Sequence, residues 1–345
     1  MTYPLSESFC TRFHCSKPPL PYLTGAKFTV LSHNPPEPTT GSCALVGDAV
    51  GERESIHPLD RCLRHPPLLG SNGQTKVDLK IVETVRTGDN RNAQLVAVRV
   101  INVGSRPSIP LPTDMNILAK IYDPLYFDHE QDDADPFLCV DHNYSHETAA
   151  YRVLGELQGT IIPKFFGSFS LELFLNGTTS RFVRLILIEI IPGVSMQDLD
   201  PTRFLQAERQ AIMKEVIDAE SRLYTYDVQH RDLFPRNVLI LGRPGLDSRP
   251  IVIVDFGTSV VGRSRFPGIP EEEQRYLPGT PISPLLRWHK ARGNRQPFQA
   301  WIDWDWQPWL EDLYGSDRAS VTELMKSVWL PPFLTEPPPQ PPGIA

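Results

Sequence analysis

Long apolar runs are absent from this chain of 345 residues. The longest, Leu185–Ile191, has seven residues with a carboxylate among them, whereas a membrane-spanning helix needs about 20 apolar residues. The first residues (MTYPLSESFCTRFHC) also lack the apolar core of a signal peptide. We therefore expect no membrane partner and an intracellular, cytoplasmic location.

Cysteine is scarce, and basic charge is not in excess. The five cysteines are an odd number and form no CxxC pair, so neither a disulfide framework nor a zinc site is expected and a reducing compartment is the default. Lys and Arg total 34 against 41 Asp and Glu, a formal net charge of −7. General nucleic-acid binding needs clustered Lys and Arg, so no nucleic-acid partner is expected. A nucleotide, which needs only a few local charges, is not excluded.

Proline, in contrast, is abundant. The 35 prolines are about twice the usual share of about 5%, and they gather at the two ends of the chain. Proline fixes φ and removes a backbone hydrogen-bond donor. We predict that residues 1–73 form a flexible extension and residues 331–345 a disordered tail.

Between these ends, the pattern of apolar residues predicts an α+β protein. Residues 74–191 indicate a mainly antiparallel sheet with one helix, and two of its strands flank the turn-rich RTGDNRN as a hairpin. The expected strands are residues 77–85, 94–102, 116–122, 164–169 and 184–191, and the expected helix is residues 144–157. Residues 192–330 indicate a second, mainly helical unit that starts with a long amphipathic helix over 201–226. Two short strands follow, at 238–241 and 251–254.

The strongest chemical signal is the run HRDLFPRN (His230–Asn237), followed after a strand hairpin by Asp255-Phe256-Gly257. Asn237 and Asp255 are placed to converge on a divalent cation. Mg²⁺ suits such a site, because it takes hard oxygen ligands together with phosphate oxygens. Asp232 is then left to orient a hydroxyl and accept its proton.

HRDLFPRN and DFG, in this order and spacing, resemble the catalytic and metal-binding loops of the protein kinase-like superfamily, in a divergent, fungal-type form. The resemblance covers residues 77–315. It implies a two-lobed fold, with a small antiparallel-sheet N-lobe over 74–191 and a mainly helical, shortened C-lobe over 192–330. It further implies ATP and Mg²⁺ as cofactors, Asp232 as catalytic base, and Asn237 and Asp255 as Mg²⁺ ligands.

The resemblance extends upstream to the nucleotide-binding residues. Lys120 resembles the strand lysine that holds the α/β-phosphates, and Glu147 matches its helix partner. Ile188, Glu189 and Ile191 would form the hinge whose backbone meets the adenine. Plainer interpretations stand beside these. Lys120 is an ordinary strand lysine that points to water, or Glu147 is a solvated surface glutamate, and Glu156 lies on the same expected helix.

The sequence also departs from the kinase pattern. The loop that should cover the phosphates offers only Gly88, and Phe234 stands where Ser/Thr kinases usually carry a lysine, so Arg236 is expected to supply that charge. No APE motif follows DFG, and only 90 residues follow Asp255. Docking of a peptide substrate is the property that these losses put most in doubt.

Three remaining patterns have plain interpretations. His142 and His146 have metal-ligand spacing but lack further ligands, so a solvated helix face is expected. The acidic run 128–136 lacks the glycine and terminal glutamate of a calcium loop, so a solvated loop is expected. Four tryptophans in residues 301–309 predict a core cluster, and with PLLRWHK they resemble the C-terminal region of fungal kinase-like proteins.

Three functions follow from these observations. The first is an ATP- and Mg²⁺-dependent phosphotransferase that acts on a protein Ser/Thr or Tyr hydroxyl. The second is a small-molecule kinase on the same fold, similar to aminoglycoside or choline kinases, which the missing APE motif favours. The third is a nucleotide-binding pseudokinase scaffold, which the poor glycine loop favours. Retention of Lys120, Asp232, Asn237 and Asp255 argues against a scaffold.

Overall fold

The computed structural model describes residues 17–104, 110–130, 133–175, 178–242, 247–331 and 334. The chain divides into two compact units: unit 1 contains residues 1–145 and 165–190, and unit 2 contains residues 146–164 and 191–345. Helices and antiparallel strands together make an α+β protein, as the sequence predicts. In the part of the chain that the structure describes, no helix combines the length and apolarity that crossing a membrane requires.

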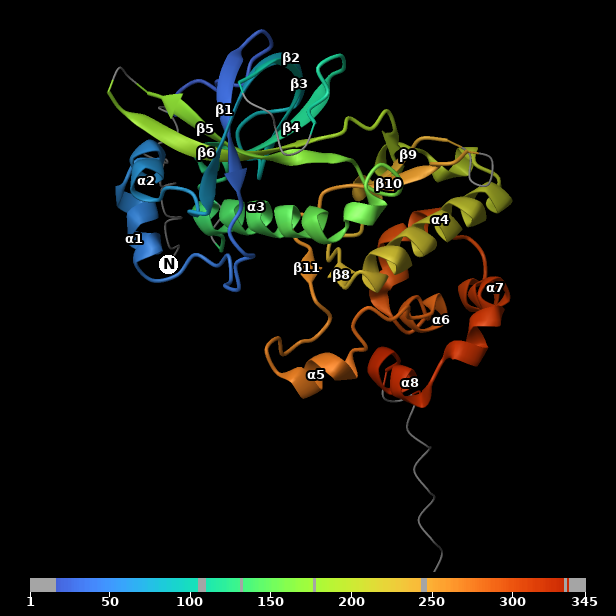
Figure 1. Cartoon of the computed structure of the whole chain (residues 1–345). Helices are drawn as coiled ribbons and strands as arrows, with labels where there is room; N and C mark the ends of the chain where they lie inside the picture. Colours follow the sequence, from blue (N-terminus) through green and yellow to red (C-terminus); the bar gives the residue numbers. More distant parts are fainter. Residues whose placement is uncertain are drawn as a thin grey trace, which may run out of the picture. The chain divides into compact units, whose positions relative to one another are not determined.

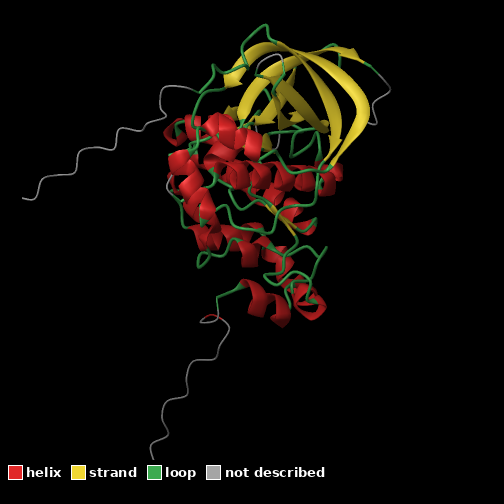
Figure 2. Ribbon diagram, turned by 90° about the vertical axis from the view of Figure 1, so that its left-hand side faces the viewer, coloured by secondary structure: helices red, strands yellow, loops and turns green. Residues whose placement is uncertain are grey.

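Unit 1 is built on a closed antiparallel barrel with the strand order β1-β2-β3-β4-β6-β5. Figure 2 shows these strands, in yellow, curving around a common interior. The strands are β1 (Lys27–Asn34), β2 (Ser71–Arg86), β3 (Gln94–Val103), β4 (Ile117–Tyr122), β5 (Phe165–Phe174) and β6 (Ser180–Ile188). All five strands expected in this region are present, and β1 is additional.

Alternation of apolar residues explains the barrel interior. Val96, Val98 and Val100 of β3 are buried, whereas Arg99 and Ile101 between and after them are exposed. Successive side chains of a strand point to opposite faces, so the β-branched residues fill the inside of the barrel. They pack there against buried residues from all five of the other barrel strands.

The expectation of a flexible extension over 1–73 is wrong for residues 17–73; residues 1–16 lie outside the described residues. β1 pairs with both β2 and β5, and Val30 lies opposite Val77 and Leu171. Two helices also lie here, α1 (Asp48–Ser55) and α2 (Pro58–Arg64), so unit 1 has more than the one helix expected. The prolines are compatible with this order because none falls within β1, and Pro58 occupies the first turn of α2, where a missing N–H costs nothing.

The helix expected at Tyr144 begins eight residues earlier, as α3 (Pro136–Val153). Asp135 accepts hydrogen bonds from the N–H groups of Phe137 (2.8 Å) and Leu138 (3.2 Å). An aspartate before a proline is thus the N-cap, and the proline takes the first helical position. The end of the expected acidic loop is therefore a helix start. α3 runs from unit 1 into unit 2, because the boundary between the units falls after Ser145.

Unit 2 is mainly helical (Figure 1). Its longest helix, α4 (Gln206–Thr225), lies within the expected range and buries an apolar face that includes Ile212, Val216 and Leu223. The short strands are β7 (Val194–Ser195), β8 (Val228–Gln229), β9 (Val238–Ile240), β10 (Ile251–Ile253) and β11 (Val260–Val261). The remaining helices are α5 (Pro270–Arg275), α6 (Pro284–Arg287), α7 (Trp306–Leu313) and α8 (Glu323–Trp329).

The expected tryptophan core is present in part in unit 2, because Trp304 and Trp309 are only half-buried. Trp301 and Trp306 are buried, and Trp306 donates from Nε1 to the carbonyl of Trp288 (2.9 Å). Trp288 in turn donates to Glu220 of α4 (3.1 Å), which also pairs with Arg287. The aromatic cluster is thereby fixed to the long helix. Of the expected disordered tail, residues 332–333 and 335–345 lie outside the described residues.

Candidate functional site

The loop that carries Asp232 begins with a strained turn. Asp232 N–H donates to the carbonyl of His230 (2.8 Å), which closes a three-residue turn centred on Arg231. Arg231 has φ 62°, in the left-handed region that non-glycine residues seldom adopt. Such conformations persist where the surroundings enforce them, and they gather at functional sites. The backbone is thus bent to project the next residue, Asp232.

Three predicted site residues come together directly after this turn. Asn237 donates from Nδ2 to the Asp232 carbonyl (2.8 Å) and to Asp232 Oδ2 (2.9 Å), and Arg236 donates to the other carboxylate oxygen, Oδ1. The Arg236 guanidinium also lies 4.5 Å from the centre of the Phe234 ring. Asn237 is only 4% exposed, whereas the Asp232 side chain keeps 25% of its surface. Asp232 is therefore held in one orientation and remains accessible.

Asp255 is tied to this loop through its neighbour Val254. The N–H of Val254 donates to the Asn237 carbonyl (2.9 Å), and the Val254 carbonyl accepts from His230 Nε2 (3.0 Å). Asp255 itself has φ 66°, a second left-handed non-glycine residue. The hairpin of β9 and β10, in which Ile253 lies opposite Val238, sets this arrangement. Asn237 and Asp255 thus extend from adjacent strand ends, as the sequence predicts.

Aromatic contacts fix the residue after Asp255. Phe256 is fully buried, with its ring centre 4.9 Å from that of His230 and 5.5 Å from that of Tyr151 on α3. Thr258 and Ser259 donate their hydroxyls to the His230 carbonyl (3.3 and 3.4 Å). The segment that follows Asp255 is therefore packed on the segment that precedes Asp232.

Sequence reasoning missed Arg263, which anchors the chain further along this segment. Its buried guanidinium donates to the carbonyls of Tyr224 (2.6 Å) and Thr280 (2.8 Å) and to others nearby, and it pairs with Asp227 (2.6 Å). Asp227 has φ 60° and also accepts from the N–H of Gly279 (2.9 Å). No sequence signal separates Arg263 from a surface arginine, because its partners are mostly backbone carbonyls.

Glu147 lies on α3, in the part that belongs to unit 2, and is fully buried. The alternative candidate, Glu156, is exposed and lies beyond the helix in a 3₁₀ turn. The expectation of a solvated face is wrong for His146: it is buried and donates from Nδ1 to the Ser259 carbonyl (2.6 Å). His146 therefore joins α3 to the segment after Asp255, a role that the sequence did not indicate.

Lys120 lies in unit 1, on β4, which is the fourth strand of the chain rather than the third because β1 precedes it. Its cross-strand neighbours are Leu95 and Ile186, and its residue is 6% exposed, so it does not point to water. Its ammonium lies 5.8 Å from the centre of the Tyr122 ring on the same strand. Lys120 and Glu147 belong to different units, and the ion pair between them remains a prediction.

The predicted hinge follows the last barrel strand. β6 ends at Ile188, which lies opposite Leu118 of β4, and the partly exposed Glu189 comes next. Unit 1 ends at Ile190, and unit 2 resumes at Ile191. Glu189 and Ile191 therefore lie on the two sides of this unit boundary, and a role of this segment in binding adenine stays a prediction.

The loop between β2 and β3, which carries Gly88, is closed by hydrogen bonds rather than rich in glycine. Gln94 is fully buried and both donates to the Gly88 carbonyl and accepts from the Gly88 N–H, each at 2.8 Å. Lys17 adds an ion pair to Asp89 (2.6 Å), and Arg91 N–H donates to the Tyr126 carbonyl (3.1 Å). Side-chain hydrogen bonds and an ion pair thus fix this loop.

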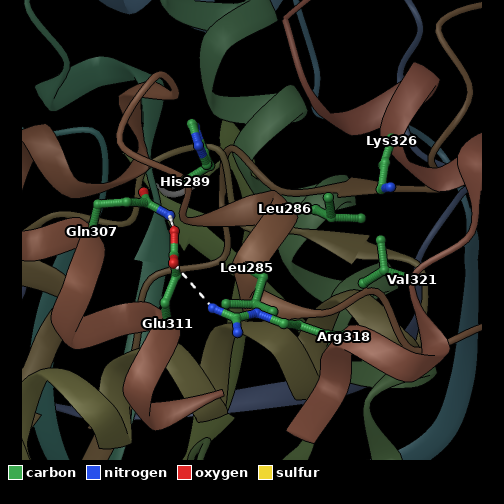
Figure 3. Close-up of a pocket in the computed structure, with 8 residues that line it drawn as sticks. All are labelled: Leu285, Leu286, His289, Gln307, Glu311, Arg318, Val321 and Lys326. Carbon is green, nitrogen blue, oxygen red and sulfur yellow. Dashed lines mark hydrogen bonds and ion pairs between the residues drawn. The ribbon is translucent and has the colours of Figure 1, made fainter. Parts of the chain in front are cut away.

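A pocket of about 330 Å³ lies elsewhere in unit 2 (Figure 3). Its polar groups are paired along one wall, where Glu311 accepts from Gln307 (2.8 Å) and from Arg318 (3.0 Å). The lining residues are Leu285, Leu286, His289, Gln307, Glu311, Arg318, Val321 and Lys326, which include no predicted site residue. Over the described ranges, no group of three or more His, Cys, Asp or Glu is placed to hold a metal ion.

Comparison with known proteins relates part of the chain to protein kinases. Over 78 residues, 23% of this chain, it is 35% identical to serine/threonine-protein kinase 17A of Oryctolagus cuniculus. The match spans only 18% of that protein's length. No model of a protein family matches the chain. The chain is therefore an α+β protein with a partial, kinase-like similarity.

Proposed function

We propose that this protein is an ATP- and Mg²⁺-dependent phosphotransferase with a two-lobed, protein kinase-like fold. The observation that carries the proposal is the loop of unit 2 in which Arg236 and Asn237 hold the Asp232 carboxylate while Asp255 emerges from the adjacent strand. A strained turn before Asp232 and a strained residue at Asp255 support it, because both place polar side chains at a loop edge. The partial similarity to a serine/threonine kinase agrees with this class of reaction.

The donor set suits Mg²⁺. The amide nitrogen of Asn237 is committed to Asp232, which leaves its oxygen to serve as a ligand, and Asp255 offers a carboxylate. Two hard oxygen donors are too few for a self-contained metal site, but Mg²⁺ commonly keeps waters and takes phosphate oxygens from its substrate. The metal would neutralise charge on the transferring phosphates.

Each remaining residue has a role of its own in the proposal. Asp232 orients the acceptor hydroxyl and accepts its proton, and Arg236 keeps the carboxylate in place and brings positive charge near it. Lys120 binds the α/β-phosphates, with Glu147 as its partner. The backbone from Glu189 to Ile191 receives the adenine. Catalysis then consists of positioning and charge stabilisation, as in other phosphoryl transfers.

A protein hydroxyl is the proposed acceptor, and a small-molecule hydroxyl is the second candidate. One observation favours the second: the helices after Asp255, α5 to α8, have six, four, eight and seven residues. Such short helices offer little of the large helical surface on which kinases dock peptides. Labelled ATP with a panel of peptides and small hydroxyl compounds separates the two acceptors.

Thermal unfolding with nucleotide tests the proposal directly. A ligand that binds only the folded state stabilises it by about 2.7 kcal/mol at a hundredfold excess over Kd. We expect Mg·ATP to raise the melting temperature, EDTA to remove most of the shift, and Asp255→Asn to weaken it. Asp305→Asn, which changes an exposed aspartate of the same unit, serves as the control. If millimolar Mg·ATP produces no shift, both catalytic functions are excluded.

A further inference from the structure

Two cysteines that lie 96 positions apart meet in unit 1. Cys43 belongs to the loop between β1 and α1, and Cys139 to the first turn of α3. Two backbone hydrogen bonds hold this loop against the start of the helix: Asp135 N–H to the Cys43 carbonyl (2.8 Å) and Leu45 N–H to the Asp133 carbonyl (3.1 Å). The Cys139 thiol also points to the Cys43 carbonyl, with Sγ 3.8 Å from the oxygen.

The two thiols also affect one another's protonation. A hydrogen bond from the Cys139 thiol lowers the pKa of Cys43 to about 7, against the opposing effects of burial and of Asp135. The same hydrogen bond raises the pKa of Cys139, and burial adds to this. Both residues are half-buried rather than sealed in the core. The thiolate is the reactive form of cysteine, so Cys43 is the nucleophile of the pair.

Cys62 shows what a structural cysteine looks like in the same unit. It is 6% exposed, and burial raises the pKa of its thiol to about 12. It lies in α2 within the apolar core, where a thiol is inert. The difference between Cys43 and Cys62 is one of environment, since neither has a sequence motif around it.

We propose that Cys43 and Cys139 form a reversible disulfide when a peroxide is present. The Cys43 thiolate attacks one oxygen of hydrogen peroxide, which breaks the O–O bond and gives a sulfenic acid and hydroxide, protonated to water. Cys139 then attacks the sulfenic sulfur, loses its proton, and expels a second water as the S–S bond forms. The two thiols are oxidised by two electrons, and the peroxide is reduced to two waters.

The bond would covalently fasten the β1–α1 loop to the beginning of α3. The backbone hydrogen bonds already keep the two chain segments together, which favours closure of the bond. A cross-link between residues so far apart in sequence restricts the unfolded chain strongly and therefore stabilises the folded state. This inference does not depend on the proposed function, because both cysteines lie in unit 1 and no nucleotide is involved.

The test treats the full chain with dilute hydrogen peroxide after complete reduction. We expect the intact mass to fall by two hydrogens, and peptide mapping to join a peptide with Cys43 to one with Cys139. The melting temperature should rise by about 5 °C, and dithiothreitol should reverse both changes. Cys62→Ser should behave as the wild type does, whereas Cys43→Ser and Cys139→Ser should each lose the cross-link and the rise.

Three outcomes overturn the proposal. The first is stepwise gain of oxygen at Cys43 with no cross-linked peptide. The second is a cross-link from Cys43 to another cysteine, such as Cys10 or Cys15. The third is a peroxide-dependent rise in melting temperature that survives in Cys139→Ser. Because the mapping is done on the wild-type chain, it decides the matter even where a variant folds poorly.

Discussion

Lys120 in unit 1 is buried on a strand that is hydrogen-bonded on both sides, to β3 and to β6, and its ammonium lies over the Tyr122 ring of the same strand. Asp232 in unit 2 lies in a loop whose backbone has one strained turn and whose carboxylate is held by two side chains, Arg236 and Asn237. Pairing with the neighbouring strands thus positions Lys120, and local side-chain hydrogen bonds position Asp232. Changes to the barrel interior should therefore act on stability, and changes to the loop should act on chemistry.

The largest effect is expected from Asp232→Asn. The substitution keeps the size of the side chain but removes the charge that orients a hydroxyl and accepts its proton, so phosphoryl transfer should fall about 10²–10⁴-fold. ATP affinity should stay within a few-fold, because Asn237 and Asp255 are untouched. Steady-state kinetics and nucleotide titration measure both quantities, with Asp305→Asn as control. A lower melting temperature with normal specific activity of the folded fraction would instead show a structural role for Asp232.

A core substitution in the barrel should show the opposite pattern. Leu185 on β6 is 1% exposed, and Leu→Ala changes at such sites cost about 2–5 kcal/mol of stability. Urea denaturation measures this cost. Ile101→Ala, at a position of the same barrel that is 52% exposed, is the control and should stay within about 0.5 kcal/mol of the wild type. Equal losses for the two variants would mean that the barrel interior does not carry the stability of unit 1.

Lys120→Met extends the comparison to a proposed functional residue of unit 1, because it removes the charge that is proposed to bind the phosphates. We expect phosphoryl transfer to fall about 10²–10³-fold, the range seen when one preorganised charge-stabilising group is lost. The melting temperature should fall as well, because Lys120 is buried and interacts with other residues. Activity is therefore compared per folded molecule. Lys80→Met, at an exposed lysine of β2, is the matched control. Glu147→Gln should do less damage than Lys120→Met, because the lysine keeps its charge. Normal activity of Lys120→Met would show that another lysine binds the phosphates.

The smallest expected effect is on how folding stability depends on pH, through Asp141 near the start of α3. Burial raises the pKa of Asp141 to about 6, against a hydrogen bond from Leu68 N–H and the charge of Arg184. The folded state therefore binds this proton more tightly than the unfolded chain does. Protonated Asp141 favours folding at low pH, and its contribution is lost as pH rises through about 6.

Asp141→Asn should remove that loss and raise stability at pH 7 by about 1 kcal/mol. Two buried histidines of unit 1 have the opposite effect on how stability depends on pH, because burial lowers the pKa of His33 and of His129 to about 4. Both therefore favour the folded state more as pH rises. The informative quantity is thus the difference between variant and wild type in urea titrations at pH 5 and pH 7. A difference that does not grow with pH would contradict the assignment.

Local order was predictable wherever neighbouring residues decide it. The barrel strands from β2 onward follow from alternation in the sequence, and α4 follows from its apolar face. The run from His230 to Asn237 and the triplet at Asp255 are short enough that spacing alone predicts their convergence around one hairpin. The N-cap at Asp135 was also present in the sequence as an aspartate before a proline, although the apolar periodicity placed the helix start later.

The sequence by itself therefore determined the α+β class, most of the elements and the grouping of Asp232, Arg236 and Asn237, because periodicity and short loops act over a few residues. Only the tertiary structure decided what depends on contacts between distant segments. β1 closes the barrel by pairing with two strands that are distant in the sequence, as Val30 does with Val77, 47 positions away, and with Leu171, 141 positions away. Arg263 finds its partners among backbone carbonyls, and Cys43 meets Cys139 across 96 positions. Such contacts depend on how the whole chain packs, so no pattern of neighbouring residues predicts them.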